Sequence, residues 1–170
     1  LYEVYKELKN EDLNTVISLM AKNHEVNGNI ITSFAGISNS KTLFCNENGY
    51  YSIYQSDRFG FNNPDNEWDK NYLDYFLIGD STTHGACVNR PYDIASVLRN
   101  NNKKNVLNLG NRGSGPLTQY AVLKEYLVPN VKNILWFFSA DNDIQDLINE
   151  INNKYINSYL RDENYFQDLK

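Results

Sequence analysis

The chain has 170 residues, of which 41% are hydrophobic and 14% aromatic, so it can bury a core and is not of the disordered class. Its formal net charge of −5 argues against a nucleic-acid partner and against a basic membrane-binding patch, because both need clustered lysine and arginine. No apolar run comes near the roughly 18 residues that a membrane span needs. The chain begins at Leu1 without a signal segment, so we expect the native start to be missing.

The first 71 residues are expected to form an extension with one helix and one β-hairpin. Four apolar residues recur at helical spacing after a polar start at 10–12, namely Leu13, Val16, Ile17 and Met20. Two runs rich in aromatic and β-branched residues, Thr42–Cys45 and Tyr50–Gln55, flank Asn48-Gly49. Because Asn and Gly both tolerate a positive φ, this arrangement predicts a hairpin. An ordered loop over 56–65 follows, in which Asp57-Arg58 is expected to form a salt-bridged brace.

From residue 72 the pattern alternates between short apolar runs and helical stretches. Strands are predicted over 72–78, 106–109 and 131–138, and the last is apolar almost throughout, as expected for a strand covered on both faces. Pro91 and Pro116 each suit the first turn of a helix. A further helix is predicted from the stripe of Ile144, Leu147, Ile148, Ile151 and Tyr155. Such alternation implies an α/β fold with a parallel sheet and helices on both of its faces.

Ligands of such folds bind beyond the carboxyl ends of the strands. The first end carries Gly79-Asp80-Ser81, the second is the turn Gly110–Gly115, and the third is Ser139–Asp143. A serine between a strand and a helix has its hydroxyl exposed at the edge of the sheet, which suits a nucleophile. The same serine can instead cap the helix, and the tripeptide alone favours the cap.

The other two strand ends also allow more than one interpretation. Backbone N–H groups of the glycine-rich turn could cradle an oxyanion or a phosphate, although no Lys-Ser or Lys-Thr pair follows, so the turn is not a P-loop. At the third end Asn142 could point its amide into the crevice, or the segment could be an N-cap cluster. Helical spacing would spread Asp141, Asp143 and Asp146 around the axis, which disfavours a Mg²⁺ site.

The two cysteines, Cys45 and Cys87, are too few for a disulfide framework and lack the spacing of a zinc or redox site. Two buried thiols are the favoured interpretation, and one disulfide is the alternative. Because His24 and His84 are the only histidines, a multi-histidine metal site is nearly excluded.

Taken together, the three strand ends resemble the blocks of the SGNH (GDSL-type) hydrolases, over about residues 72–150. Gly79-Asp80-Ser81 matches the first block, with Ser81 in the nucleophile position. Gly113 matches the second-block glycine, and Asn142-Asp143 matches the Asn-Asp of the third block. The segments 45–64 and 79–87 look like a bacterial branch of that family with an N-terminal extension.

The resemblance implies a three-layer α/β/α, flavodoxin-like fold, of which this chain is the N-terminal part. It implies hydrolysis or transfer of an ester through an acyl-serine intermediate on Ser81. The N–H groups of Ser81 and Gly113 and the side chain of Asn142 would hold the oxyanion. No metal or organic cofactor is implied.

Two departures from the family pattern matter. Ala140 stands where the third block begins with Gly, which is a mild change. The final block, Asp-x-x-His, supplies the base of the family, and nothing in the 170 residues fits it, so we expect the chain to stop before that block. His84, three residues after Ser81, is expected to be a neighbour of the nucleophile or a packed polar residue, and His24 a surface residue. Asp80 and His84 are the expected substrate-binding residues.

The preferred function is therefore a serine esterase for a small-molecule or carbohydrate ester, with an extension over 1–71 and an SGNH-like domain over 72–170. One alternative is a non-catalytic SGNH-like domain that has lost the base and binds a carbohydrate or a partner. Another is a flavodoxin-like phosphate binder that uses the turn Gly110–Gly115. The resemblance suggests the cell envelope, while the sequence itself leaves the compartment open.

Overall fold

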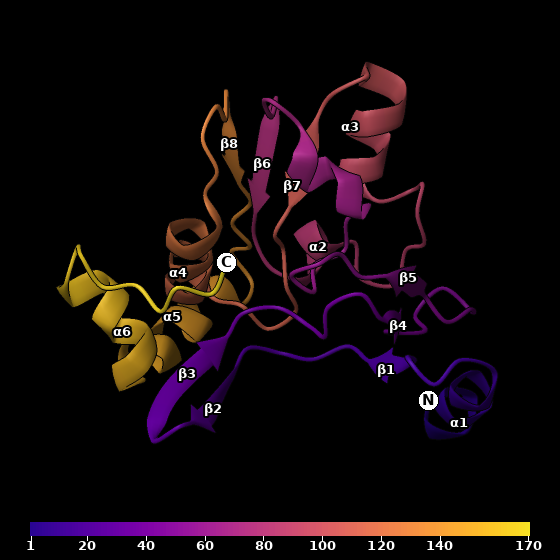
Figure 1. The fold of residues 1–170 in the computed structure, drawn as a ribbon, viewed down its shortest axis with the longest axis horizontal. Helices are drawn as coiled ribbons and strands as arrows, with labels where there is room; N and C mark the ends of the chain where they lie inside the picture. Colours follow the sequence, from indigo (N-terminus) through magenta and orange to yellow (C-terminus); the bar gives the residue numbers. More distant parts are fainter.

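The computed structural model describes residues 1–170 (Figure 1). Its helices are α1 (Tyr2–Glu11), the 3-10 helix η1 (Asp65–Asp69), α2 (Ser81–His84), α3 (Ile94–Asn102), α4 (Pro116–Tyr126), α5 (Asp143–Ile151) and α6 (Lys154–Arg161). Its strands are β1 (Val16–Ile17), β2 (Lys22–Val26), β3 (Asn29–Ser33), β4 (Lys41–Leu43), β5 (Ile53–Gln55), β6 (Tyr75–Ile78), β7 (Val106–Asn108) and β8 (Ile134–Trp136). None of the helices has both the length and the apolar character that a membrane-spanning segment requires.

The helix predicted from Leu13 to Met20 is wrong. The helix of this region is α1, which ends at Glu11, and Leu13 is 79% exposed. Val16 and Ile17 instead form β1, which pairs in parallel with β4. Both residues are β-branched and fit a strand well, so pairing with β4 overrides the helical spacing.

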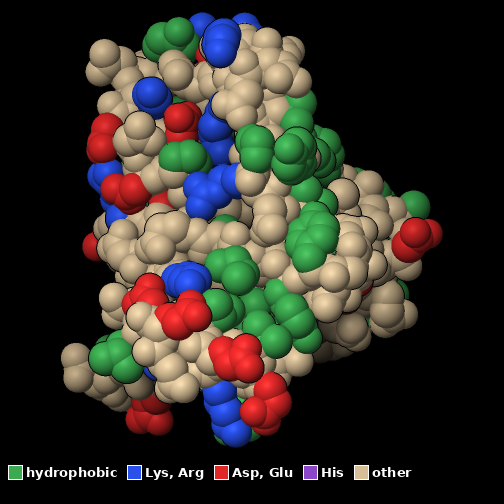
Figure 2. All heavy atoms as spheres, turned by 90° about the vertical axis from the view of Figure 1, so that its right-hand side faces the viewer, with side chains coloured by type: hydrophobic (Ala, Val, Ile, Leu, Met, Phe, Trp, Pro, Cys, Tyr) green, Lys and Arg blue, Asp and Glu red, His purple; other side chains and the backbone are tan.

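The hairpin predicted around Asn48-Gly49 is confirmed. Strands β4 and β5 pair antiparallel, with Thr42 opposite Tyr54, and the loop between them is longer than a two-residue turn. With β1 they form a three-stranded sheet in the order β1-β4-β5. Figure 2 shows the face of the molecule on the side of α1, β5 and α3, where hydrophobic side chains gather between groups of charged ones.

The predicted α/β architecture with a parallel sheet is also confirmed. The sheet has the order β7-β6-β8, and β6 pairs in parallel with both neighbours. Phe76 of β6 lies between Leu107 of β7 and Ile134 of β8. Because all three strands run in the same direction, their carboxyl ends meet at one edge of the sheet.

Helices α3 and α4 lie on opposite faces of this sheet. Side chains alternate between the faces along a strand. Phe76 and Ile78 of β6 belong to the larger hydrophobic core together with Val122 of α4. Leu77, between them, belongs to a second cluster with Ala95 of α3. Strands β6 and β7 therefore have both faces covered, one on the side of α4 and the other on the side of α3.

The larger core also contains residues from before and after the parallel sheet. Phe34 and Phe61 of the N-terminal part are fully or almost fully buried in it, as is Tyr159 of α6. The Phe34 and Tyr159 rings meet edge to face at 5.7 Å between centroids. The division between residues 1–71 and 72–170 stays a prediction, and hydrophobic packing crosses it.

Strand β8 is not covered on both faces, contrary to the prediction. It pairs with β6 along one edge, and Ile134 and Trp136 are each more than two-fifths exposed. Phe138, just beyond the strand, is 58% exposed. A continuous apolar run cannot distinguish a central strand from an edge strand, because it does not show how many elements pack against it.

The single helix predicted from the stripe between Ile144 and Tyr155 is divided in the structure between α5 and α6, and the stripe does not mark the buried side of α5. Its apolar residues Ile144 and Ile148 are more than half exposed, whereas Asp143 and Glu150 are buried. Glu150 accepts hydrogen bonds from the N–H groups of Gly115 (2.8 Å) and Leu117 (2.9 Å). The first N–H groups of a helix have no partner within it. The buried side of α5 is polar because it supplies the acceptors that the start of α4 needs.

Of the two predicted helix-opening prolines, only Pro116 opens a helix. It occupies the first turn of α4. Pro91 follows a cis peptide bond and lies before α3, which begins at Ile94. Asp93 caps that helix by accepting a hydrogen bond from the Ser96 N–H at 2.9 Å.

The expected brace in the loop over 56–65 is confirmed for Arg58. Its guanidinium pairs with Asp65 at 2.7 Å and with Asp69 at 2.9 Å. Asp57 has a different role: it is fully buried and accepts hydrogen bonds from two backbone N–H groups of the loop and from the Trp68 indole. Burial raises the pKa of Asp57, while these hydrogen bonds oppose the rise. Asp57 thus holds the loop together from inside.

Candidate active site

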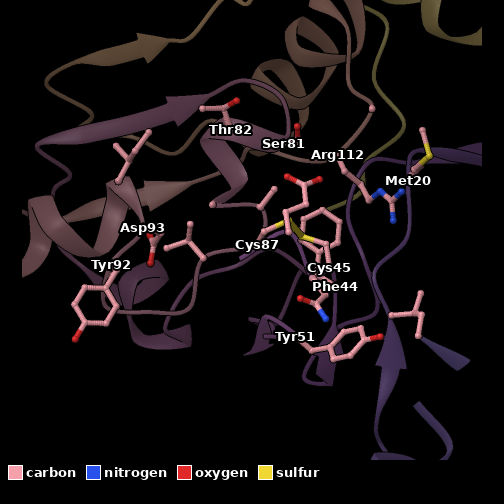
Figure 3. Close-up of a pocket in the computed structure, with 18 residues that line it drawn as sticks. Met20, Phe44, Cys45, Tyr51, Ser81, Thr82, Cys87, Tyr92, Asp93 and Arg112 are labelled. Atoms are coloured by element: carbon pink, nitrogen blue, oxygen red, sulfur yellow. A yellow bond between two sulfur atoms is a disulfide. The ribbon is translucent and has the colours of Figure 1, made fainter. Parts of the chain in front are cut away.

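A cavity of about 910 Å³ lies next to the start of α2. Its lining includes Phe44, Tyr51, Ser81, Tyr92, Arg112 and Gly113. Figure 3 shows Ser81 and Arg112 on one side of the cavity, the disulfide beside them, and the two tyrosines further out. The structure therefore brings together two of the three predicted catalytic residues, Ser81 and Gly113, from two different strand ends.

Ser81 is the first residue of α2, directly beyond the end of the central strand β6. The cap of this helix is Asp80, whose Oδ1 accepts a hydrogen bond from the Thr82 N–H at 2.9 Å. The interpretation of Ser81 as the capping residue is therefore wrong. Its hydroxyl is not needed for the helix, and it is partly exposed in the cavity.

Two glycines allow α2 to sit tightly on the strand ends. A Cβ at Gly79 would collide with the side chain of Thr83, and a Cβ at Gly110 would collide with the backbone between Thr83 and His84. Neither residue has a positive φ, so the requirement is space and not backbone conformation. The glycines of the first and second strand ends thereby allow the close approach of α2 to the sheet, which sets the position of Ser81.

A group of buried asparagines holds α2 from below. The Asn108 side chain donates to the Thr83 carbonyl at 2.7 Å, and Asn62 donates to the His84 carbonyl at 3.0 Å. Asn63 in turn donates to the Asn108 carbonyl at 2.9 Å and accepts from its N–H. Asn62 and Asn63 are supporting residues that the sequence pattern does not reveal. The sequence shows only that these residues belong to a polar loop before Trp68. It gives no indication that this loop packs under α2.

Gly113 faces the cavity from the turn after β7. Its φ is +65°, in the region that favours glycine, and a Cβ there would collide with the end of the Met20 side chain. Its N–H makes no hydrogen bond within the chain. A free backbone N–H on the wall of a cavity can donate to a negatively charged oxygen.

The third predicted catalytic residue, Asn142, is not among the residues that line the cavity. It precedes α5, and its side-chain amide donates to Asp146 at 3.1 Å. Asp143 beside it is buried and accepts a hydrogen bond from the Ser139 N–H at 2.6 Å. The Asp143 carboxylate is thus used in a hydrogen bond to the backbone and does not form a metal site with Asp141 and Asp146. Nowhere in the structure do three or more acidic, histidine or cysteine side chains form a group that could hold a metal ion.

Neither of the expected substrate-binding residues lines the cavity. Asp80 is buried and uses its carboxylate as the cap of α2. His84 is 2% exposed, and its ring packs edge to face against Phe44 and Tyr54. Both residues therefore support the position of Ser81 from behind.

The charge state of His84 follows from its surroundings. Its Nδ1 lies 3.2 Å from the Gly110 carbonyl oxygen, and its Nε2 is buried without a partner. A carbonyl can only accept, so Nδ1 carries the proton and Nε2 is bare. Burial lowers the pKa of His84 from 6.5 to about 4, so the ring is neutral at pH 7. His24 lies on exposed β2, where Nε2 is 3.0 Å from the Ser33 hydroxyl.

Cys45 and Cys87 form a disulfide, so the favoured interpretation as two thiols is wrong. The bond joins the loop after β4 to the segment after α2, and both cysteines line the cavity. It ties the hairpin of the N-terminal part to the element that carries Ser81. Sequence could not decide the pairing, because the two residues are 42 positions apart.

Comparison of the chain with known protein families, with curated proteins and with solved structures found no match.

Proposed function

We propose that this chain carries the nucleophile and part of the oxyanion hole of a serine ester hydrolase with a flavodoxin-like SGNH fold of three α/β/α layers. One observation carries the proposal. Asp80 caps α2, so the Ser81 hydroxyl is not used as a cap, and Ser81 lines the same cavity as Gly113, whose N–H has no partner within the chain. The motif resemblance at the three strand ends supports the same assignment. The substrate class is a small-molecule or carbohydrate ester.

In the proposed reaction, Ser81 Oγ attacks the ester carbonyl carbon and forms a tetrahedral intermediate. The Gly113 and Ser81 N–H groups donate to the oxygen that becomes negatively charged. Breakdown releases the alcohol and leaves an acyl-serine, which water or a second alcohol then attacks. Asn142 does not line the cavity, so its amide contributes only if the side chain turns towards it.

The proton of Ser81 needs a general base. His84 cannot take this role, because its ring is enclosed in the core and its basicity is low. His24 lies on the β2–β3 hairpin and not in the cavity. Neither of the two histidines can therefore act as the base in this arrangement.

A fluorophosphonate probe tests the proposal on the full-length protein. The probe should label the wild type and should fail to label Ser81→Ala. Thr82→Ala is the matched control, because Thr82 lines the same cavity and is the next residue. Equal labelling of Ser81→Ala and wild type would show that Ser81 is not the nucleophile.

A second candidate function is a non-catalytic domain that binds a carbohydrate or a partner in the same cavity. The position of both histidines outside the cavity favours it. This candidate requires that the full-length protein leaves the probe unreacted while a ligand still binds in the cavity of both wild type and Ser81→Ala.

The disulfide bears on the compartment. Disulfides persist in oxidising environments such as the cell exterior and the bacterial envelope, and are rare where glutathione keeps thiols reduced. We therefore propose an extracytoplasmic location. Formation of the Cys45–Cys87 bond in protein isolated from the native cells, measured by thiol alkylation and mass spectrometry, tests it.

A further inference from the structure

The cavity contains one positively charged side chain. Arg112 lines it together with two acidic residues, Glu47 and Asp93. Asp93 is buried and caps α3, whereas Glu47 is exposed in the loop between β4 and β5. The chain as a whole carries a net charge of −5, so acidic side chains outnumber basic ones, and the positive charge of Arg112 in the cavity is contrary to that general trend.

Arg112 has no partner for its charge within the chain. Its guanidinium takes part in none of the ion pairs, which involve Arg58, Arg99 and three lysines. Glu47 is also absent from those pairs. An arginine has five N–H donors and no acceptor, so its hydrogen-bonding capacity is available to a ligand.

The guanidinium is nevertheless held in place. It lies over the ring of Phe44, with 5.1 Å between the guanidinium carbon and the ring centroid. Phe44 is buried and is followed by Cys45 of the disulfide, and its ring also packs on His84 at 5.0 Å. A planar guanidinium stacked on an aromatic ring leaves its edge donors free for a carboxylate or phosphate.

Two further groups lie near Arg112 in the cavity. Arg112 immediately precedes Gly113, whose N–H is free, and Figure 3 shows Arg112 on the same side of the cavity as Ser81. Arg112, Gly113 and Ser81 therefore line one cavity, with Arg112 and Ser81 on the same side of it.

We propose that Arg112 is a specificity residue that binds an anionic group, a carboxylate or a phosphate, carried by the ligand of this cavity. The binding of an anion by Arg112 does not depend on the proposed function. Only the identification of the ligand as the ester substrate rests on it. The substrate would then be an acidic ester, bound with its anionic group on Arg112 and its carbonyl at Ser81.

The test is a titration of the isotopically labelled protein with sodium phosphate and, separately, with sodium acetate, each at constant ionic strength against sodium chloride. The N–H signals of Gly113 and of the Arg112 side chain are followed by NMR. We expect saturable shifts with at least one anion. The anion that binds with the higher affinity identifies phosphate or carboxylate as the preferred group. Arg112→Gln should weaken that binding by about 10-fold or more, and Arg112→Lys should lose less.

Arg161→Gln is the matched control, because it changes the net charge equally on an exposed residue at the end of α6. It should bind like the wild type. The proposal is overturned if neither anion gives saturable shifts, or if Arg112→Gln and Arg161→Gln bind alike. If the full-length protein binds the anion but is not labelled by the fluorophosphonate probe, the esterase proposal is rejected and the Arg112 site is supported. If the protein is labelled but does not bind the anion, the Arg112 site is rejected and the esterase proposal is supported.

Discussion

His84 Nδ1 donates to the Gly110 carbonyl oxygen across 3.2 Å, linking the helix that carries Ser81 to the turn after β7. This bond joins the first and second strand ends inside the core, behind the cavity. Burial of the ring keeps the histidine neutral, even though the bond to Gly110 by itself favours the charged form.

The first prediction concerns acid. The pKa of His84 is about 4 in the folded protein and 6.5 in its ordinary state. A lowered folded pKa contributes stability that is complete above pH 6.5 and is lost as the pH falls towards 4. The difference corresponds to about 3 kcal/mol, at ~1.4 kcal/mol per pH unit. Denaturant unfolding of wild type should show this fall, and His84→Phe should reduce its slope.

His24→Asn is the control for that experiment, because His24 is exposed. Its pH profile should follow that of the wild type. Burial also raises the pKa of Asp57 and of Glu150, but both groups are common to all three proteins. Parallel profiles for wild type and His84→Phe would contradict the prediction.

The second prediction concerns the cap of α2. Asp80→Ala removes the acceptor for the Thr82 N–H and should lower the free energy of unfolding by about 1 kcal/mol. It should also weaken probe labelling of Ser81 in the full-length protein, because the start of α2 loses its anchor. Asp80→Asn retains a side-chain oxygen that can accept and should stay near wild type in both measurements. If Ala and Asn behave alike, the cap is not what positions Ser81.

The third prediction concerns the disulfide. Its loss should lower the free energy of unfolding by roughly 2–5 kcal/mol, because a closed loop restricts the unfolded chain. Melting with and without a reductant should therefore differ for the wild type. The double variant Cys45→Ser with Cys87→Ser should melt at the lower temperature under both conditions. A wild type whose melting is insensitive to full reduction would speak against a structural role.

The fourth prediction concerns activity of the 170-residue chain itself. Without a general base, a serine hydroxyl is a weak nucleophile, and loss of a triad member typically costs several powers of ten. We expect little or no turnover of p-nitrophenyl acetate. Robust turnover that Ser81→Ala abolishes would show that a base is present within these residues.

Several features could be predicted because they are local. Short apolar runs separated by turn residues identified the three parallel strands, and Asn-Gly identified the β4–β5 hairpin. A proline suited to a first turn identified the start of α4, but the same reasoning failed at Pro91, where the chain has not yet entered a helix. The rule describes what a residue permits and does not by itself show that a helix follows.

The site shows the same division. The order of strands and turns along the chain already placed Ser81 and Gly113 at one edge of a sheet, because the carboxyl ends of parallel strands coincide. It did not show whether Ser81 caps α2 or leaves its hydroxyl free, because a serine at this position can do either. The hydrogen bond from the Thr82 N–H to Asp80 decided that question, and burial in the core removed His84 from the cavity.

The length, composition and charge of the chain, and the spacing of its apolar residues, were thus sufficient for the fold class and the edge of the sheet where the site lies. Only the tertiary structure decided which helices and strands pack against one another and which of their faces are buried. It turned α5 to present Glu150 inward, left β8 at an edge, and joined Cys45 to Cys87. These outcomes depend on contacts between residues far apart in the chain, whose free energies exceed the local preferences from which a sequence pattern is read.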